Sequence, residues 1–300
     1  MSGGGTGLRH HSPEPTDPTR VVVLGGRGFV GRELVAALEQ AGISTMAPTR
    51  RELELTAPDA GDRLAALLRP ADSLVVLAAL TPDRGRGIEP FVANMAIGAA
   101  IARALARVAP AHVVYVSSDA VYPMRAGRVS EASCAEPPDL YGMMHRARET
   151  MVAAASPAPL AILRPTLLYG AADTHNSYGP NRLRRAAHKE GRIALFGDGD
   201  DMRDHLFVDD FVALTLLVLR HRSQGVLNCA TGRSVSYAEL ARKIAARFER
   251  PVEIVAAPRQ APVAHRHFDV TALHKAFPTF RFTPLDQGLA RAHRQMLGQP

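Results

Sequence analysis

Short apolar runs alternate with helical patterns over the first half of the chain, and this alternation limits the possible folds more than any other feature. The apolar runs fall at residues 21–24, 43–47, 73–79, 112–117 and 160–164, and the helical patterns between them at 32–41, 59–68, 89–108 and 140–155. Strands that are apolar on both faces are typical of a parallel sheet covered by helices on each side. The alternation therefore predicts the α/β class, with a doubly wound parallel sheet.

Three glycines form the turn between the first predicted strand and the first predicted helix. Gly25 permits a tight turn, Gly28 lets the backbone approach a pyrophosphate, and Gly31 lets the helix pack closely on the sheet. The helix N-terminus then faces the anion. The turn predicts a dinucleotide site whose backbone includes Phe29 and Val30.

The end of the second predicted strand bears on the choice of cofactor. An NAD site usually has a carboxylate there to hold the ribose 2′-hydroxyl, but this chain has Thr49, Arg50 and Arg51. Two guanidinium groups suit a 2′-phosphate, so NADP is favoured and NAD is the second choice. The alternative is that both arginines start a solvated loop. Glu54, followed by Leu55, could accept a hydrogen bond from the adenine amino group.

Composition divides the chain into three parts. Residues 1–19 are rich in Gly, Pro and His without an apolar core, which predicts a disordered leader. The alternating pattern predicts a dinucleotide-binding domain over residues 20–170. Glycines, prolines and charges then dominate up to Asp204 and the elements become shorter. Residues 171–300 are therefore expected to form mainly a smaller α/β region that binds substrate, partly interleaved with the first domain.

Charge and cysteine content disfavour several classes of function. The net charge is +7, with 36 Lys+Arg against 29 Asp+Glu, but the basic residues are scattered. That distribution disfavours nucleic-acid binding and fits an anionic small molecule. Cys134 and Cys229 form no CxxC pattern, so we expect neither a disulfide framework nor a metal site. No apolar run is expected to reach the length of a membrane span, and we expect a cytoplasmic protein.

Further motifs connect the chain to a known family. They are GGRGFVG at 25–31, SSDAVY at 117–122, a helix that starts near Tyr141, LRPTLLYG at 163–170 and RDHLFVDD at 203–210. From residue 21 onward the chain resembles the extended short-chain dehydrogenases/reductases, the NAD(P)-dependent epimerase/dehydratase group with a Rossmann fold that acts on nucleotide sugars. The resemblance implies that Ser118 hydrogen-bonds the substrate oxygen and that Tyr141 moves the proton while hydride passes to or from the nicotinamide.

His145 stands where this family has a lysine, four residues after the tyrosine. The i,i+4 spacing keeps both side chains on one helix face, but an imidazole is only partly charged near pH 7. One hypothesis is that His145 replaces the lysine, binds the nicotinamide ribose and acidifies Tyr141 when protonated. The other is that the site is impaired and that the chain is a non-catalytic, cofactor-binding regulatory protein.

The residues after Ser118 narrow the reaction. By resemblance, Asp119 matches the Asp of the Thr-Asp-Glu run that sugar dehydratases of the family carry, but Ala120 stands where they have the Glu. Enzymes of the family that epimerise a carbon next to a ketone have a catalytic cysteine at the position of Ala120. The resemblance therefore favours reduction of a keto group on a nucleotide-linked deoxysugar, with a nucleotide-sugar 4-epimerase as the alternative.

The same resemblance implies further contacts. Asp119, Asn181, Arg203 and Arg266 would bind the nucleotide-diphosphate sugar, the two arginines by clamping its diphosphate. Additional cofactor contacts are expected from Ala78, Ala79, Asn94, Ser117 and Pro165. The helices at 89–108 and 140–155 are expected to face a second subunit in a homodimer.

Overall fold

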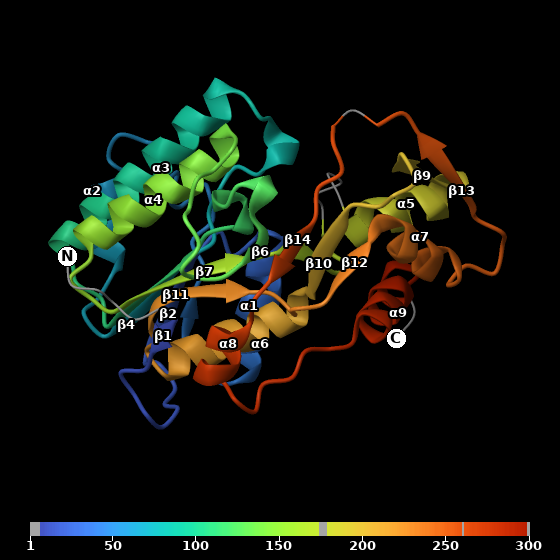
Figure 1. The fold of residues 1–300 in the computed structure, drawn as a ribbon. Coiled ribbons are helices and arrows are strands. Elements are labelled where there is room, and N and C mark those ends of the chain that lie inside the picture. Colours follow the sequence, from blue (N-terminus) through green and yellow to red (C-terminus); the bar gives the residue numbers. More distant parts are fainter. Residues whose placement is uncertain (1–6, 174–178, 260, 299–300) are drawn as a thin grey trace.

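A computed structural model describes residues 7–173, 179–259 and 261–298 and shows a larger and a smaller lobe (Figure 1). The larger lobe contains β1 (Leu8–Arg9), β2 (Arg20–Leu24), α1 (Phe29–Gln40), β3 (Thr45–Met46), α2 (Ala60–Leu67), β4 (Asp72–Val76), α3 (Ile88–Arg107), β5 (His112–Val116), α4 (Leu140–Ala155), β7 (Leu160–Pro165), α6 (Val208–Arg220), β11 (Gln224–Cys229) and α8 (Thr271–Ala276). Short 3-10 helices follow β4 and β5, namely η1 (Pro82–Arg84), η2 (Asp119–Val121) and η3 (Met124–Ala126).

The smaller lobe and its junction with the larger one are built mostly from the second half of the chain. They contain β6 (Gly127–Val129), β8 (Leu167–Tyr169), α5 (Gly179–Glu190), β9 (Arg192–Phe196), β10 (Met202–Phe207), β12 (Ser234–Ser236), α7 (Tyr237–Ala245), β13 (Glu253–Ala257), β14 (Arg266–Phe268) and α9 (Leu285–Met296). Between these elements, α6, β11 and α8 return to the larger lobe (Figure 1).

A seven-stranded sheet in the order β1-β11-β7-β5-β4-β2-β3 forms the centre of the larger lobe. All neighbouring strands are parallel except β1, which runs antiparallel to β11. From β2 the chain goes first to β3, on one side of β2 in the sheet, and then to β4, on the other side of β2. Ligands of open α/β sheets bind at the carboxyl ends of the strands beside such a reversal. The doubly wound parallel sheet predicted from the sequence is confirmed.

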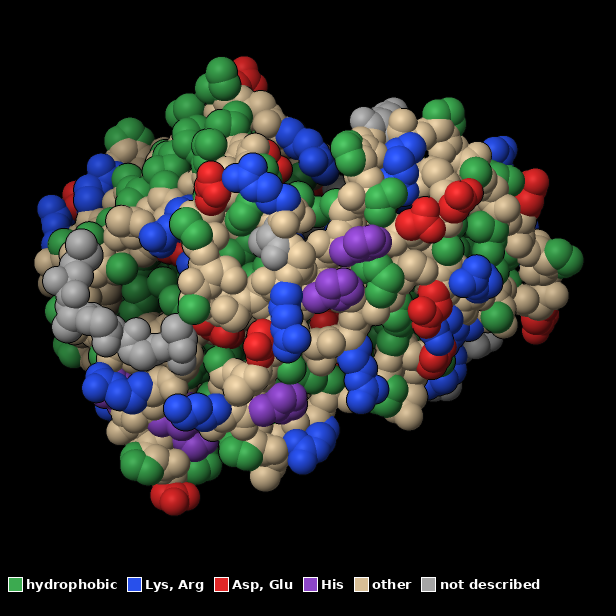
Figure 2. Space-filling model, viewed as in Figure 1, with side chains coloured by type: hydrophobic (Ala, Val, Ile, Leu, Met, Phe, Trp, Pro, Cys, Tyr) green, Lys and Arg blue, Asp and Glu red, His purple; other side chains and the backbone are tan. Residues whose placement is uncertain are grey.

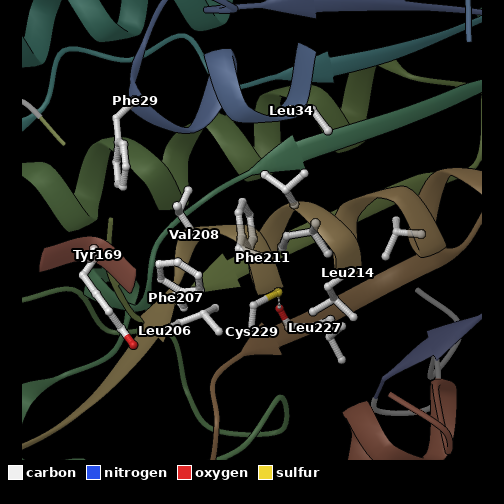
Figure 3. Packing of buried hydrophobic residues seen from close by; sticks show 14 of the residues in the cluster. Phe29, Leu34, Tyr169, Leu206, Phe207, Val208, Phe211, Leu214, Leu227 and Cys229 are labelled. Atoms are coloured by element: carbon white, nitrogen blue, oxygen red, sulfur yellow. Dashed lines mark hydrogen bonds between the residues drawn. The ribbon is translucent and has the colours of Figure 1, made fainter. Parts of the chain in front are cut away.

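Successive residues of β2 show why its run is apolar throughout. Val21 and Val23 join the core cluster that includes residues of α1 and α6, whereas Val22 and Leu24 join the cluster under α2, α3 and α4. Adjacent side chains of a strand point to opposite faces of the sheet, so both faces need apolar residues. Figure 3 shows part of the first cluster, with Phe211 of α6 packed between the sheet and α1.

Residues 7–19 correct the prediction of a disordered leader, whose residues 1–6 lie outside the described part. Leu8 pairs with Gly225 across β1 and β11. The ring of His10 stacks on that of His221 at 4.5 Å between centroids, and its Nδ1 lies 2.8 Å from Ser223 Oγ. The prediction was wrong because it used composition alone, whereas contacts with distant residues hold this segment.

Helix α3 corrects a second expectation. It is 20 residues long with a mean hydropathy of 1.3, so by length and composition it could cross a membrane. In the structure it packs against α2 and α4, and 39% of its most apolar window is buried. The expectation that no apolar run reaches this length is therefore wrong.

Candidate active site

The turn between β2 and α1 presents the first amides of a helix to an anion. Gly25 has a φ of +89°, and its carbonyl accepts a hydrogen bond from Gly28 N at 3.0 Å. A Cβ on Gly31 would lie 2.2 Å from Gly25 O, so the helix could not start this close to the turn with any other residue. No side chain caps α1, and no acid lies in its first turn. Its first N–H groups therefore suit a pyrophosphate.

The side chain of Phe29 belongs to the core. It is 6% exposed, and its ring lies beside Gly170 and Val208 (Figure 3). Val30 is half-buried and packs against the same cluster. Only the backbone amides of these two residues can serve a phosphate.

The loop after β3 starts beside the glycine turn, because a Cβ on Gly26 would lie 2.7 Å from Ala47 Cβ. The Arg50 side chain is 83% exposed, and its Nε donates to the Glu54 carboxylate. Thr56 Oγ1 also donates to Glu54, at 2.7 Å. The hydrogen bond from Arg50 lowers the pKa of Glu54. This carboxylate is therefore engaged by its neighbours and is poorly available to an adenine amino group.

Three other residues of this loop have distinct surroundings. Arg51 is exposed to solvent. The backbone N–H of Thr49 donates to Glu52 Oε2 at 2.8 Å. Leu55 is buried in the core cluster under α2, α3 and α4, so its side chain faces the protein interior.

Ser118 lies just after β5 and caps the 3-10 helix η2. Its Oγ accepts a hydrogen bond from Ala120 N at 3.1 Å. A serine hydroxyl that accepts in this way still carries a proton that it can donate to a further oxygen. Ser118 is half-buried, which is compatible with contact to a bound molecule.

Tyr141 lies in the first turn of α4, which packs against η2. Asp139 caps the helix by accepting a hydrogen bond from Gly142 N at 2.9 Å. A Cβ on Gly142 would lie 2.2 Å from Ala120 O, so glycine is needed for this close approach. The contact brings the turn that carries Tyr141 against the backbone two residues after Ser118. The start of α4, which carries Tyr141, and the end of β5, which is followed by Ser118, therefore lie next to each other.

His145 follows Tyr141 by one turn and is 3% exposed. Its ring meets that of Tyr141 edge-on at 4.8 Å between centroids, and its Nδ1 lies 3.1 Å from Tyr115 Oη. Burial lowers the pKa of His145 to about 3, and the positive charge of Arg148 acts in the same direction. The imidazole is therefore neutral at pH 7. Its Nε2 is buried without a hydrogen-bond partner.

Ser117 and Asn94 are bound to other parts of the protein. Ser117 Oγ donates to Glu149 Oε1 at 2.7 Å, and Arg164 makes two hydrogen bonds to the same carboxylate. The Asn94 amide bonds both the N–H and the C=O of Leu80 at 2.9 Å. The Ser117 side chain therefore connects the end of β5 to α4, and the Asn94 side chain connects α3 to the segment after β4.

The remaining expected cofactor residues lie at strand ends. Ala78 and Ala79 follow β4 and are half-buried, and Pro165 is the buried last residue of β7. Their backbone position at the carboxyl edge of the sheet agrees with the region where a dinucleotide would lie.

Asp119 and Arg266 bind each other. Arg266 Nη1 lies 3.1 Å from Asp119 Oδ2 and donates to Asp119 O at 2.9 Å, while Nη2 donates to Tyr122 O at 2.8 Å. Arg266 is 4% exposed. In the structure the pair ties β14 to η2, and both terminal nitrogens of Arg266, which a diphosphate clamp would use, bond groups of the protein.

Asn181 is 1% exposed and bonded internally. Its Nδ2 donates to Asp173, and its Oδ1 accepts from Gly170 N and Arg184 Nη2, both at 3.4 Å. In this arrangement Asn181 joins α5 to the segment after β8. The residues just before α5, at 174–178, lie outside the described part.

A cavity of about 930 Å³ lies between the segment at 124–127 and the smaller lobe. Arg203, which the resemblance assigns to the substrate's diphosphate, lines it and donates to Met202 O and Ala264 O at 2.8 and 2.6 Å. Arg182 and Arg259 line the same cavity, together with Phe196 and Tyr237. Sequence reasoning missed these two arginines because no motif marks them. Guanidinium groups gathered around one cavity suit a diphosphate.

Comparison with known proteins agrees with the motifs. The model described as the NAD dependent epimerase/dehydratase family matches residues 21–230. The chain is 26% identical over 231 residues to a dTDP-4-keto-6-deoxy-D-glucose reductase of Streptomyces niveus, a match that covers 74% of this chain and 76% of the relative. It is 34% identical over 203 residues to a dTDP-4-dehydrorhamnose reductase of Streptomyces griseus, with 66% of this chain and 60% of that relative covered.

A solved structure is similar over nearly the whole chain. The structure of MoeE5 in complex with UDP-glucose and NAD superposes with a TM-score of 0.79 at 25% identity, covering 93% of this chain and 99% of MoeE5. The family resemblance and the fold that it implied are confirmed.

Proposed function

Because the chain belongs to the NAD dependent epimerase/dehydratase family, we propose that it reduces a keto group on a nucleotide-linked deoxysugar, with NADPH as the reductant. The observation that carries this proposal is the close approach of Gly142 to Ala120, which brings the turn of Tyr141 against the end of the strand that carries Ser118. The names of the two reductase relatives support the reaction and the dTDP-linked substrate class.

The residues of the site divide the chemistry between them. Bound NADPH would supply the hydride that reduces the carbonyl carbon. Ser118 donates its hydroxyl proton in a hydrogen bond to the carbonyl oxygen, because its own oxygen already accepts from Ala120 N. Tyr141 transfers its phenolic proton to the same oxygen as negative charge develops there. His145 donates from Nε2 to a ribose hydroxyl of the cofactor.

The cofactor fits observations in two places. The glycine turn has uncapped helical amides for the pyrophosphate, and His145 Nε2 is a buried nitrogen without a partner. NADP rather than NAD is supported by the exposed Arg51 and by the engagement of the two acids nearest to it, Glu54 with Arg50 and Glu52 with the Thr49 amide. NAD remains the second choice, since MoeE5 binds NAD.

The substrate's diphosphate would lie in the cavity lined by Arg182, Arg203 and Arg259, in which Arg259 also forms an ion pair with Asp201 at 2.8 Å. This differs from the set expected by resemblance, because Asn181 and Arg266 are not among the residues that line the cavity. Arg203 belongs to both sets.

A homodimer through α3 and α4 is supported by exposed apolar side chains. Ile88 and Val92 of α3 are 71% and 57% exposed, and Met143 of α4 is 47% exposed. Figure 2 shows hydrophobic side chains over these two helices on the face in view. Sedimentation of the protein against a Val92→Glu variant tests the interface, and we expect the variant to be monomeric. We also expect the enzyme to act in the cytoplasm.

A nucleotide-sugar 4-epimerase is the second candidate, favoured by the similarity to MoeE5 in complex with UDP-glucose and NAD. Two assays separate the candidates. A reductase consumes NADPH in proportion to an added dTDP-4-keto-6-deoxysugar, whereas an epimerase interconverts UDP-hexoses without net loss of cofactor. Turnover of UDP-hexoses together with no loss of NADPH would overturn the reductase proposal.

A further inference from the structure

A buried guanidinium lies one turn beyond His145 on α4. Arg148 is 1% exposed, its Nη2 donates to Ala78 O at 2.8 Å, and its Nη1 lies 3.4 Å from Asn94 Oδ1. Its Nε has no hydrogen-bond partner. Within the described ranges no carboxylate pairs with this cation. Guanidinium groups keep their proton in proteins, so Arg148 is a buried charge without a counterion.

The neighbouring helix makes room for this side chain. A Cβ on Gly98 of α3 would lie 2.8 Å from Arg148 Cγ and 3.4 Å from Met151 Sδ. Glycine in the middle of a helix is less favourable than alanine, and a buried unpaired charge is also unfavourable. Two locally unfavourable features, the glycine within α3 and the unpaired charge of Arg148, therefore accompany the guanidinium in this position. Uncompensated buried charges of this kind are typical of functional sites.

Arg148 lies behind a row of three rings that ends at Tyr141. Its Cζ is 5.4 Å from the centre of the Tyr115 ring, Tyr115 Oη is 3.1 Å from His145 Nδ1, and the His145 ring contacts Tyr141 edge-on. Burial lowers the pKa of Arg148, and the ionised forms of Tyr115 and Tyr141 act in the opposite direction. The attraction is mutual, so the cation favours a phenolate at Tyr141.

His145 is not a substitute for a fixed cation, because it is neutral at pH 7. Burial raises the pKa of Tyr115 to about 12, so its phenol keeps its proton and can serve as the donor to His145 Nδ1. The imidazole then carries its own hydrogen on Nε2. His145 can donate a hydrogen bond there but adds no positive charge.

The carboxylates around the first turns of α4 are engaged by other donors: Glu149 by Arg164, Asp119 by Arg266, and Asp139 by the Gly142 amide. The N-terminus of α4 adds a partial positive charge to the same region. Arg148, in contrast, carries a full positive charge, and its side chain is buried one turn beyond His145.

We propose that Arg148 is a positioning residue whose fixed charge stabilises the phenolate of Tyr141, while His145 serves as a neutral hydrogen-bond donor. This rests on the proposed function in one respect, namely that Tyr141 exchanges a proton with the substrate. The electrostatic part can be tested without substrate or cofactor.

Ultraviolet titration of tyrosine measures this effect directly. The chain has 6 tyrosines and no tryptophan, so tyrosinate absorbance is not masked. The difference between the protein and Tyr141→Phe isolates Tyr141, and we expect its midpoint below the ordinary value of about 10. Arg148→Met should raise that midpoint by about one pH unit. Arg148→Lys should not restore the shift, because a buried ammonium without a counterion loses its proton below the pH at which tyrosine titrates. Arg146→Met, which removes an exposed charge from the same helix, should leave the midpoint in place.

Three results would overturn the proposal. They are an unchanged midpoint in Arg148→Met, an equal shift in Arg146→Met, and weaker NADPH binding by Arg148→Met without any shift, which would make Arg148 a cofactor ligand. If Arg148→Met does not fold, Gly98→Ala serves as the second variant, because its methyl group displaces the Arg148 stem. It should move the midpoint in the same direction by a smaller amount, and no movement would contradict the inference.

The pH profile of reduction provides a second readout. The phenol must be protonated to donate, so the rate falls above the pKa of Tyr141, and Arg148→Met should move this alkaline limb up by about one pH unit. A purely structural role would lower the rate without moving the limb. If the wild-type protein reduces no keto sugar, the proposed function fails while the titration still decides the role of Arg148.

Discussion

The polar side chains of the site differ in how much hydrogen-bonding capacity remains for a ligand. Ser118 can still donate its proton, and His145 has an unpartnered Nε2. The Asn181 amide and both terminal nitrogens of Arg266, in contrast, already bond groups of the protein. Residue type and motif position do not reveal this difference, because it depends on partners that are distant in sequence.

Arg51 provides a test of cofactor choice. Unlike Arg50, which pairs with Glu54, Arg51 is exposed and forms no described ion pair. Hydrogen bonds to charged groups contribute about 1.5–3 kcal/mol, so Arg51→Ala should weaken NADPH binding by roughly tenfold to a hundredfold. NADH binding, measured by fluorescence titration, should change less than about twofold. An equal loss for both cofactors would contradict a contact with the 2′-phosphate.

The first turn of α4 is the element on which the site geometry depends most. A Cβ on Gly142 would lie 2.2 Å from Ala120 O and 2.8 Å from Pro137 Cβ, so Gly142→Ala must push the turn away from η2. A displacement of about 1 Å can lower the rate about a hundredfold. We therefore expect kcat to fall by at least about tenfold in steady-state assays with NADPH.

Gly87→Ala is the matched control, since a Cβ at Gly87 meets no atom within 4 Å. It should keep the kcat of the wild-type protein. If Gly142→Ala also keeps its kcat, the contact between α4 and η2 does not position Tyr141.

The sheet could be predicted from the sequence because the apolar pattern of each strand lies in consecutive residues. Val21–Leu24 is apolar at every position, which requires helices on both faces, and the structure has them. Ser118 and Tyr141 were also recognisable, because they lie in local motifs at a strand end and a helix start. Such features need no knowledge of distant neighbours.

Other features depend on long-range contacts and could not be predicted. Residues 7–19 are held by β11 and by backbone bonds to His221 and Arg220. The guanidinium of Arg148 is buried only because Gly98 of another helix makes room for it. Arg182 and Arg259 reach one cavity from elements that are far apart in the chain.

Both lobes bury neutral imidazoles, and this makes the whole molecule sensitive to acid. Burial lowers the pKa of His112 to about 4 and the pKa values of His145 and His205 to about 3 each, from an ordinary 6.5. The unfolded chain therefore binds more protons than the folded one between about pH 6.5 and 4. The stability that these groups contribute is present above pH 6.5 and is lost as the pH falls through this window.

Between pH 7 and 5.5 each of these histidines should lower the free energy of unfolding by about 1 kcal/mol, and the buried carboxyl of Asp204, whose pKa is raised to about 6, should offset a smaller part of that fall. Urea unfolding at the two pH values measures the change. His205→Gln, which cannot gain a proton, should show a shallower dependence on pH. An unfolding free energy that stays constant over this interval would contradict the burial of neutral imidazoles.

The molecule as a whole is proposed to bring a reductant on the large sheet to a sugar held at the junction of the two lobes. The most direct measurement follows deuterium from the transferable position of deuterated NADPH in the presence of a dTDP-4-keto-6-deoxysugar, with product analysed by mass spectrometry and NMR. We expect one deuterium on the former carbonyl carbon of the sugar in the wild-type reaction. With Tyr141→Phe we expect a loss of at least about a hundredfold in rate and little change in NADPH binding. The absence of deuterium from the sugar, or full activity of Tyr141→Phe, would contradict the account.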